Sequence, residues 1–177
     1  MKKIFNIGGY TYIELILYIA IVTIMMQALI PFAWSIIQGG VKSSVQQEVF
    51  SQTRFISEKL KLEIRNAGDI SLAQSDFDVN LAENATKKIT LTTLTGQTIV
   101  IDVSSGVVRI KRGSNPPVAI NAANIAVTDL TFTNYSSLDS KTKHVGFMLS
   151  TTSSNPSPRQ EYQANIALKT SSEIRSN

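Results

Sequence analysis

The residue with the clearest chemical interest in this sequence is Glu14, a single carboxylate at the start of a long apolar run. From Leu15 to Ile37 the chain has 23 residues without a formal charge. As a helix, this run would rise roughly 34 Å, about the thickness of a membrane's hydrocarbon core. Placing a carboxylate in such a setting costs on the order of 2.5 to 3.5 kcal/mol. Glu14 is therefore a candidate functional residue, and its charge needs a partner.

Spacing alone leaves two explanations for Glu14 open. The carboxylate can lie at the headgroup level and be hydrated, because it is close to the helix start. Alternatively, it pairs with a cation on another molecule. Within the chain, Lys2 and Lys3 lie beyond Gly8-Gly9, and Lys42 lies 28 residues away, which is roughly 42 Å along a helix.

The acidic residues after the helical region form a loose group that first suggests calcium. They are Asp69, Asp76, Asp78 and Glu83. Their spacing does not match an EF-hand loop, in which alternate oxygen ligands precede a glycine. We therefore expect a solvated linker and no metal site.

A short basic cluster, Arg109, Lys111 and Arg112, is the candidate for a DNA contact. With Lys87 and Lys88 it would make a positive face, whose phosphate contacts would give salt-dependent affinity. The formal net charge is only +4, and without Lys2 and Lys3 there are 15 basic against 13 acidic residues. We therefore do not expect nucleic-acid binding, and Arg109, Lys111 and Arg112 are named only as the residues that a DNA contact would use.

The remaining composition argues against an enzyme. The chain has no cysteine and one histidine, which excludes a disulfide framework, a thiolate metal site, a cysteine nucleophile and a two-histidine relay. No nucleophile elbow, P-loop or zinc-binding helix motif is present. Asp102 and Asp129 lie within strand patterns and are interpreted as edge-strand protection. His144 is predicted to be a half-exposed residue at a strand start. We expect no catalytic residue and no cofactor.

The apolar run itself is best interpreted as a membrane-spanning helix. A cleaved secretory signal is the alternative, but its apolar region is normally about 7 to 15 residues long and ends at a small-residue cleavage site. No such site follows the run in this sequence.

A second apolar pattern with helical spacing follows the first. We predict one helix from about Tyr10 to Ala67, with a bend or soft segment at Pro31 and Gly39-Gly40. On its polar faces, the four-residue spacings Arg54/Glu58 and Lys59/Glu63 predict surface ion pairs. The buried stripe is predicted to comprise Val41, Val45, Val49, Ile56, Leu60, Ile64 and Ala67.

Beyond a polar linker, residues 69–87, the pattern changes to strands. Six β-rich runs are predicted, with tight turns at Thr95-Gly96 and Ser104-Ser105-Gly106. They would form one antiparallel sheet covered by the helix stripe. The predicted class is α+β, a long N-terminal helix packed on an antiparallel β-sheet, with a frayed tail at 171–177. The six runs are residues 87–94, 97–103, 106–113, 126–135, 144–152 and 161–170.

The N-terminal residues resemble the class III leader of type IV pilins and type II secretion pseudopilins. The match comprises Lys2-Lys3, Gly8-Gly9, the stretch Tyr10 to Leu15 and about twenty apolar residues that include Pro31. The resemblance implies that a prepilin peptidase cuts after Gly9 and methylates the amine of Tyr10. It also implies that Glu14, the fifth mature residue, pairs with the N-terminal amine of a neighbouring subunit.

The rest of the chain resembles, more loosely, the minor pilins and pseudopilins of the PilW and GspJ types. Its counterparts there are the helix end near Ile64 to Ala67 and the hairpin that follows. Many major pilins of this family have a C-terminal cysteine pair, and its lack here favours a minor component or a lineage that does without the disulfide loop.

The resemblance implies a domain organisation and a set of partners. Residues 1–9 would be the leader, 10–38 the transmembrane and filament-core helix, and 39–177 an extracytoplasmic α+β head. The partners would be the peptidase, other pilin or pseudopilin subunits and an inner-membrane assembly platform. The protein would be a single-pass cytoplasmic-membrane protein before assembly, and part of a filament or the cell surface afterwards. Two alternatives stay open: a membrane-anchored binding domain that never polymerises, and a DNA-uptake pilin.

Overall fold

The computed structural model describes residues 11–137, 142–155, 157 and 159–174 of the chain. Helix α1 spans Tyr12–Asn66, and its assignment continues without a break through Pro31 and Gly39-Gly40. The predicted helix is therefore confirmed, and its predicted soft segment does not interrupt the helix. By its internal contacts the chain divides into two units, Met1–Gly40 and Val41–Asn177.

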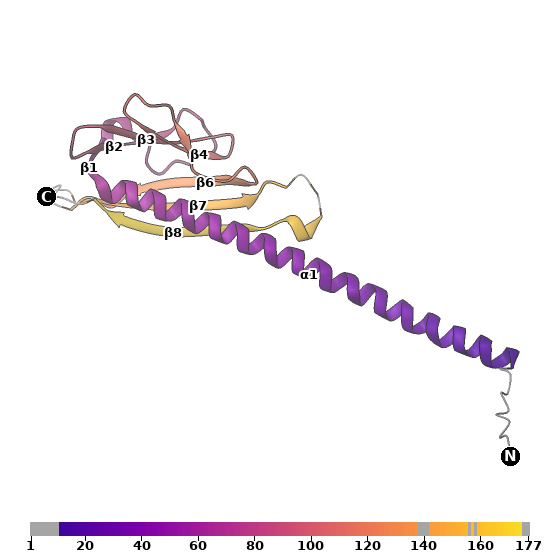
Figure 1. Cartoon of the computed structure of the whole chain (residues 1–177). Helices are drawn as coiled ribbons and strands as arrows, with labels where there is room; N and C mark the ends of the chain where they lie inside the picture. The colour runs from indigo at the N-terminus through magenta and orange to yellow at the C-terminus, as the bar shows by residue number, and fades with distance from the viewer. Residues whose placement is uncertain (1–10, 138–141, 156, 158, 175–177) are drawn as a thin grey trace, which may run out of the picture. The chain divides into compact units, whose positions relative to one another are not determined.

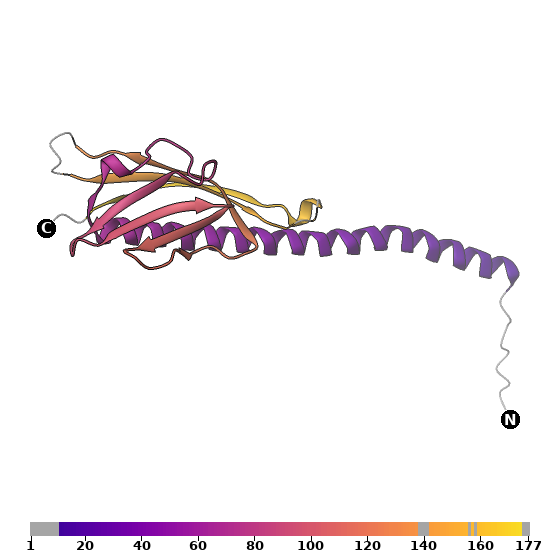
Figure 2. The same ribbon diagram turned by 90° about the horizontal axis from the view of Figure 1, so that it is seen from above.

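The second unit contains two antiparallel sheets, where the sequence predicted one. The first has the order β1-β2-β3-β4-β5 and the second β6-β7-β8. Figures 1 and 2 show both sheets packed with the C-terminal part of α1, which gives the predicted α+β class. The strands are β1 (Ala67–Ile70), β2 (Lys88–Thr93), β3 (Thr98–Ser104), β4 (Val107–Arg112), β5 (Val118–Ala119), β6 (Ile125–Asn134), β7 (His144–Ser153) and β8 (Asn165–Glu173), and short 3-10 turns occupy Leu72–Gln74 and Gln160–Tyr162.

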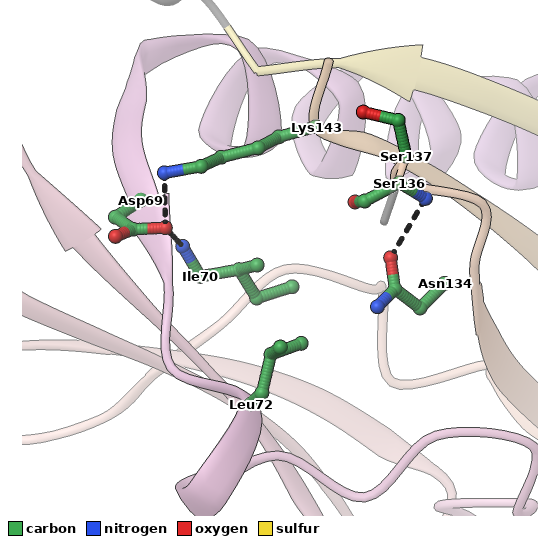
Figure 3. A pocket seen from close by; sticks show the side chains of 7 residues that line it. All are labelled: Asp69, Ile70, Leu72, Asn134, Ser136, Ser137 and Lys143. Atoms are coloured by element: carbon green, nitrogen blue, oxygen red, sulfur yellow. Dashed lines mark hydrogen bonds and ion pairs between the residues drawn. The ribbon is translucent and has the colours of Figure 1, made fainter. Parts of the chain in front are cut away.

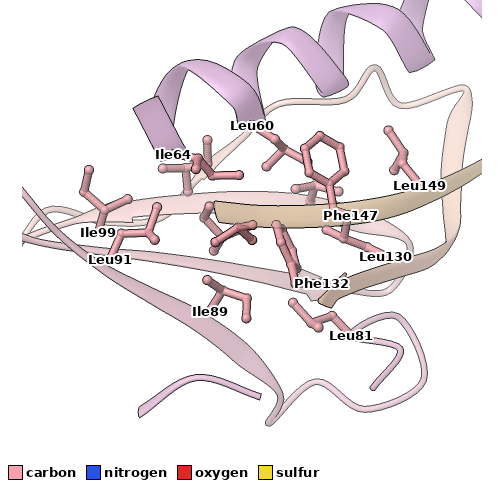
Figure 4. Close-up of a cluster of buried hydrophobic side chains, with 14 of the residues drawn as sticks. Leu60, Ile64, Leu81, Ile89, Leu91, Ile99, Leu130, Phe132, Phe147 and Leu149 are labelled. Atoms are coloured by element: carbon pink, nitrogen blue, oxygen red, sulfur yellow. The ribbon is translucent and has the colours of Figure 1, made fainter. Parts of the chain in front are cut away.

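The core of the second unit lies between the helix and the two sheets. In Figure 4, Leu60 and Ile64 of α1 point into a cluster that contains Phe132 and Phe147. These two rings, from β6 and β7, have centroids 5.6 Å apart. The helix stripe is buried from Val49 to Ala67, whereas Val41 and Val45 are only half-buried.

A hydroxyl fills the gap in the predicted apolar stripe between Val49 and Ile56. Thr53 lies there, fully buried. Its Oγ1 donates to the Val49 carbonyl at 2.6 Å and lies 2.5 Å from Oγ1 of Thr151 in β7. A polar residue can occupy this core position because both hydroxyls are hydrogen-bonded.

The turn between β3 and β4 has the backbone expected of a two-residue hairpin. Ser105 and Gly106 both have positive φ, 51° and 76°, and Ser104 pairs with Val107 across the turn. This is the conformation that matches the twist of paired strands. The Gly106 carbonyl accepts a hydrogen bond from Val127 N at 2.9 Å, so the turn also connects the two sheets.

The segment predicted as a solvated linker is in fact packed. Leu81 within it is fully buried. The Asn80 side-chain oxygen accepts hydrogen bonds from Ala82 N at 2.9 Å and Leu130 N at 3.1 Å, while its amide nitrogen donates to Thr128 O at 3.2 Å. The amide satisfies backbone groups that water would otherwise satisfy. The segment thus covers the outer edge of β6.

The strand order corrects one further prediction, and the length of β8 corrects another. Asp102 lies in β3, the central strand of the five-stranded sheet, so it does not protect an edge. It instead lies between Lys88 and Arg109 on the neighbouring strands. At the C-terminus, β8 continues to Glu173 and the side chain of Ile174 is buried. Residues 171–174 are therefore ordered, and residues 175–177 lie outside the described part.

Candidate functional site

The first turn of α1 places Glu14 among helix-starting hydrogen bonds. The carbonyl of Thr11 accepts from Glu14 N at 3.0 Å and from Leu15 N at 3.2 Å. The Thr11 hydroxyl also accepts from Glu14 N, at 3.4 Å. A carboxylate in a first turn gains about 0.3 to 1 kcal/mol from the helix dipole. That gain is smaller than the insertion cost, and Glu14 has no ion pair with any other described residue.

The apolar part of α1 exposes its large side chains on all faces. The most apolar 18-residue window of the helix has no buried residue. The core helix of a soluble domain would pass the same length and composition test, but it would be mostly buried. The helix lies near the N-terminus and is long and apolar enough to cross a membrane. The exposed side chains include Ile13, Leu17, Tyr18, Ile24, Ile30, Phe32, Trp34 and Ile36.

The predicted processing residues, Gly9 and Tyr10, lie outside the described residues. Their roles in cleavage and N-methylation therefore stay predictions. Of the three residues of the N-terminal hypothesis, the structure places only Glu14.

The three candidate DNA contacts do not act as one free basic face. Arg109 Nε donates to Asp102 at 2.7 Å, and the Arg112 guanidinium donates to Glu63 of α1. Lys111 is exposed and has no ion pair with another described residue. A strand alternates its faces, so Arg112 lies on the opposite side of β4 from Arg109 and Lys111. Two of the three cations therefore already form ion pairs with carboxylates of this chain.

Two of the four acidic residues that follow the helix, Asp69 and Asp76, form ion pairs with lysines. No group of three or more metal-binding side chains occurs among the described residues. Lys87 Nζ lies 3.0 Å from Asp76. This hydrogen bond and that from the Lys88 backbone lower the pKa of Asp76. Asp69 pairs with Lys143 Nζ at 2.7 Å, and this hydrogen bond, with a smaller one from Ile70 N, lowers the pKa of Asp69.

The Asp69–Lys143 pair borders an open pocket that the sequence pattern did not predict. Figure 3 shows Lys143 reaching across to Asp69, and Asn134 accepting from Ser136 N. The pocket has a volume of about 580 Å³. Its lining residues are Asp69, Ile70, Leu72, Asn134, Ser136, Ser137 and Lys143. They come from segments more than 60 residues apart, so no local motif marks them.

Comparisons with models of protein families, with curated proteins and with solved structures returned no match. Any assignment of function to this chain therefore rests on its own residues.

Proposed function

We propose that this chain is a structural subunit, a prepilin of minor pilin or pseudopilin type, that assembles into a type IV pilus or a type II secretion-like filament. One observation carries the proposal. A single helix has an N-terminal half whose apolar side chains are exposed and whose first turn holds one carboxylate without an ion pair to a described residue. One face of the C-terminal half of the same helix packs into the core of an α+β head.

The exposed apolar half of the helix is stable only where its side chains are removed from water. Before assembly, the subunit lies in a membrane, where lipid contacts the exposed apolar half of its helix. Outside the membrane, burying the same surface between subunits is favourable by about 25 cal/mol per Å². A filament whose core consists of such helices would provide that burial.

Glu14 gives this assembly its register. A carboxylate that lacks a partner in the single subunit, and gains a neighbour's amine on assembly, favours one axial position of the neighbour over others. Buried polar residues fix helix register in coiled coils by the same logic. In this proposal Glu14 has no catalytic role, and the head faces outward or contributes to the filament tip.

The decisive experiment determines the mature N-terminus. The full chain is co-expressed with a prepilin peptidase and analysed by intact-mass and N-terminal peptide mass spectrometry. The proposal expects a chain that begins at N-methylated Tyr10. A Gly9→Leu variant serves as the control, because it leaves the apolar helix unchanged and should remain unprocessed.

Two results would contradict the proposal. An intact Met1 in the presence of active peptidase would favour a plain membrane anchor with a non-polymerising head. Cleavage beyond the apolar run would favour a secreted head domain.

A further inference from the structure

The two sheets differ in how their edges are protected. The five-stranded sheet ends in β1, of four residues, and β5, of two. In the other sheet, the outer edge of β6 is covered, because Asp78 N and Leu81 N donate to Phe132 O and Leu130 O at 2.7 and 2.9 Å. Its opposite edge is β8, which has nine residues and pairs only with β7. Within the described residues, β8 is the longest strand with an open edge.

The pairing at both ends of β8 shows which of its backbone groups point outward. Ser153 N donates to Ala164 O at 3.0 Å, and Ile174 N donates to Lys143 O at 2.8 Å. The register between these two pairs is continuous. In an antiparallel ladder, hydrogen-bonded pairs alternate with pairs whose backbone groups face away. Even-numbered residues of β8 therefore bond to β7, and Asn165, Ala167, Lys169, Ser171 and Glu173 present N–H and C=O groups to a new strand.

A groove runs beside this edge, between β8 and α1. Two adjoining cavities of about 250 and 340 Å³ share Phe50 and Ile166. Phe50 is 54% exposed, and Ile166 and Leu168 are half-buried. On the helix the groove extends from Gln46 to Lys61, which is about 22 Å at the helical rise. That length accommodates roughly six residues of an extended strand.

The groove contains a polar group and charges that have no partner among the residues the structure describes. Ser57 lines it, is 1% exposed, and its Oγ has no hydrogen-bond partner in the described structure. Lys61 Nζ is already bonded to Glu58 at 3.1 Å. Arg54 and Lys169 also line the groove, and neither has an ion pair with another described residue. The uncompensated charge of the groove is positive.

We propose that the open edge of β8 and the adjoining groove bind an extended segment of a partner protein by strand addition. The segment is about six residues long and alternates apolar residues with carboxylates. Its backbone continues the β8 ladder, its apolar side chains pack on Phe50 and Ile166, and its carboxylates lie on the opposite face of the sheet, beside Lys169. Strand addition of this kind takes affinity from backbone hydrogen bonds and specificity from alternate side chains. This binding does not involve the apolar N-terminal half of α1 and is independent of filament assembly.

A lysine in the middle of an edge strand also has a simple protective role, since it discourages unwanted strand pairing. The two roles make different predictions. A purely protective lysine disfavours every incoming strand, whereas a recognition lysine favours an acidic strand over a basic one.

The test uses the full chain in detergent micelles and two synthetic peptides. The probe is acetyl-Val-Glu-Val-Thr-Val-Glu-amide, and the matched probe replaces both glutamates by lysine. Binding is measured by titration, and amide hydrogen exchange is followed residue by residue. The acidic peptide should slow exchange at Ala167, Lys169 and Ser171, and the basic peptide should bind at least about threefold more weakly, as expected for an exposed ion pair. Lys169→Glu should reverse this preference.

Proline variants separate the backbone contact from side-chain effects. Ala167→Pro removes an outward N–H without removing a β7 hydrogen bond, so affinity for the acidic peptide should fall about tenfold. Ala167→Thr keeps the N–H and should bind as the parent does. Ser171→Pro provides a second variant, and protection of the Ile166 and Leu168 amides verifies that β8 remains paired.

Several outcomes would overturn the proposal. These are unchanged exchange at the outward amides, equal binding of the two peptides, or full binding by both proline variants. Concentration-dependent protection of the same amides without peptide would assign the edge to a second copy of this chain instead.

Discussion

The Thr53 hydroxyl in α1 lies 2.5 Å from the Thr151 hydroxyl in β7, and both residues are buried. Because Thr53 donates to the Val49 carbonyl, Thr151 must donate to Thr53. The two threonines therefore form a directed chain of hydrogen bonds from the three-stranded sheet into the helix backbone. They connect the helix to the sheet where the apolar stripe is interrupted.

Replacing Thr53 by valine should lower the free energy of unfolding by about 1 to 3 kcal/mol, because the buried Thr151 hydroxyl loses its acceptor. The double variant Thr53→Val with Thr151→Val should be less destabilised than the sum of the single variants, since no unsatisfied hydroxyl remains. Urea unfolding of the four proteins, followed by circular dichroism, measures the coupling. Strict additivity would show that the two hydroxyls are energetically independent.

Removing the guanidinium of Arg112 should destabilise the fold. Its partner Glu63 has a side chain only 8% exposed, whereas that of Arg112 is 48% exposed. Arg112→Ala should cost about 1 to 3 kcal/mol, less than the 3 to 5 typical of fully buried pairs, because the guanidinium is half in water. The matched control is Lys111→Ala, next to it on β4, which should change stability by less than about 0.5 kcal/mol.

Of these two variants, only Lys111→Ala gives a clear test of DNA binding. Neutralising Arg109 or Arg112 removes an ion pair within the chain, so lost DNA retention would be ambiguous. Lys111→Ala removes no ion pair between described residues, so its effect on DNA retention can be interpreted directly. Retention of DNA that is unchanged in Lys111→Ala and lost only in unstable variants would dismiss the basic cluster as a contact.

Acid should weaken the link between Asp69 and Lys143. The Lys143 hydrogen bond lowers the pKa of Asp69 in the folded state, so folding favours the ionised carboxylate. This contribution is present above the unfolded pKa of about 4 and is lost as pH falls through the lower folded pKa. The Asp69 side chain is 59% exposed, so the contribution should be below about 1 kcal/mol.

The measurement compares unfolding of the parent and Asp69→Asn between neutral pH and pH 2. The parent should lose stability relative to the variant as the pH falls, and the difference should be greatest at neutral pH. High salt should reduce the difference, because it screens exposed pairs. A difference that grows as the pH falls would contradict the assignment.

Structural features that depend on residues close together in the sequence could be predicted from it, whereas features that depend on distant residues could not. Alternating patterns located six of the eight strands, and the stripe from Val49 to Ala67 located the buried helix face. These signals are local, because side-chain period and hairpin turns depend on neighbouring residues. The two missed strands, β1 and β5, have four and two residues and are too short to show a period.

Partners distant in sequence could not be predicted. The four-residue spacing predicted a Lys59–Glu63 pair, but Glu63 bonds Arg112, 49 residues away. Asp69 and Lys143 are 74 residues apart. Period-two patterns likewise show which face of a strand is apolar but not which strand lies beside it. The division into two sheets, the pocket and the β8 groove all depend on such pairings.

The final prediction concerns Glu14 and tests its proposed role separately from processing. Glu14→Gln should still be cut and methylated, because the leader is unchanged, and should insert in the membrane at least as well, because an amide costs less in lipid than a carboxylate. Its entry into filaments, in competition with the parent, should fall about tenfold or more, since a hydrogen bond to a charged group contributes about 1.5 to 3 kcal/mol. Glu58→Gln is the matched control: this exposed carboxylate on the same helix bonds Lys61, and its loss should leave assembly unchanged. Equal incorporation of Glu14→Gln and the parent would mean that the carboxylate is only hydrated at the membrane surface, and that helix packing alone sets the axial position of the subunits.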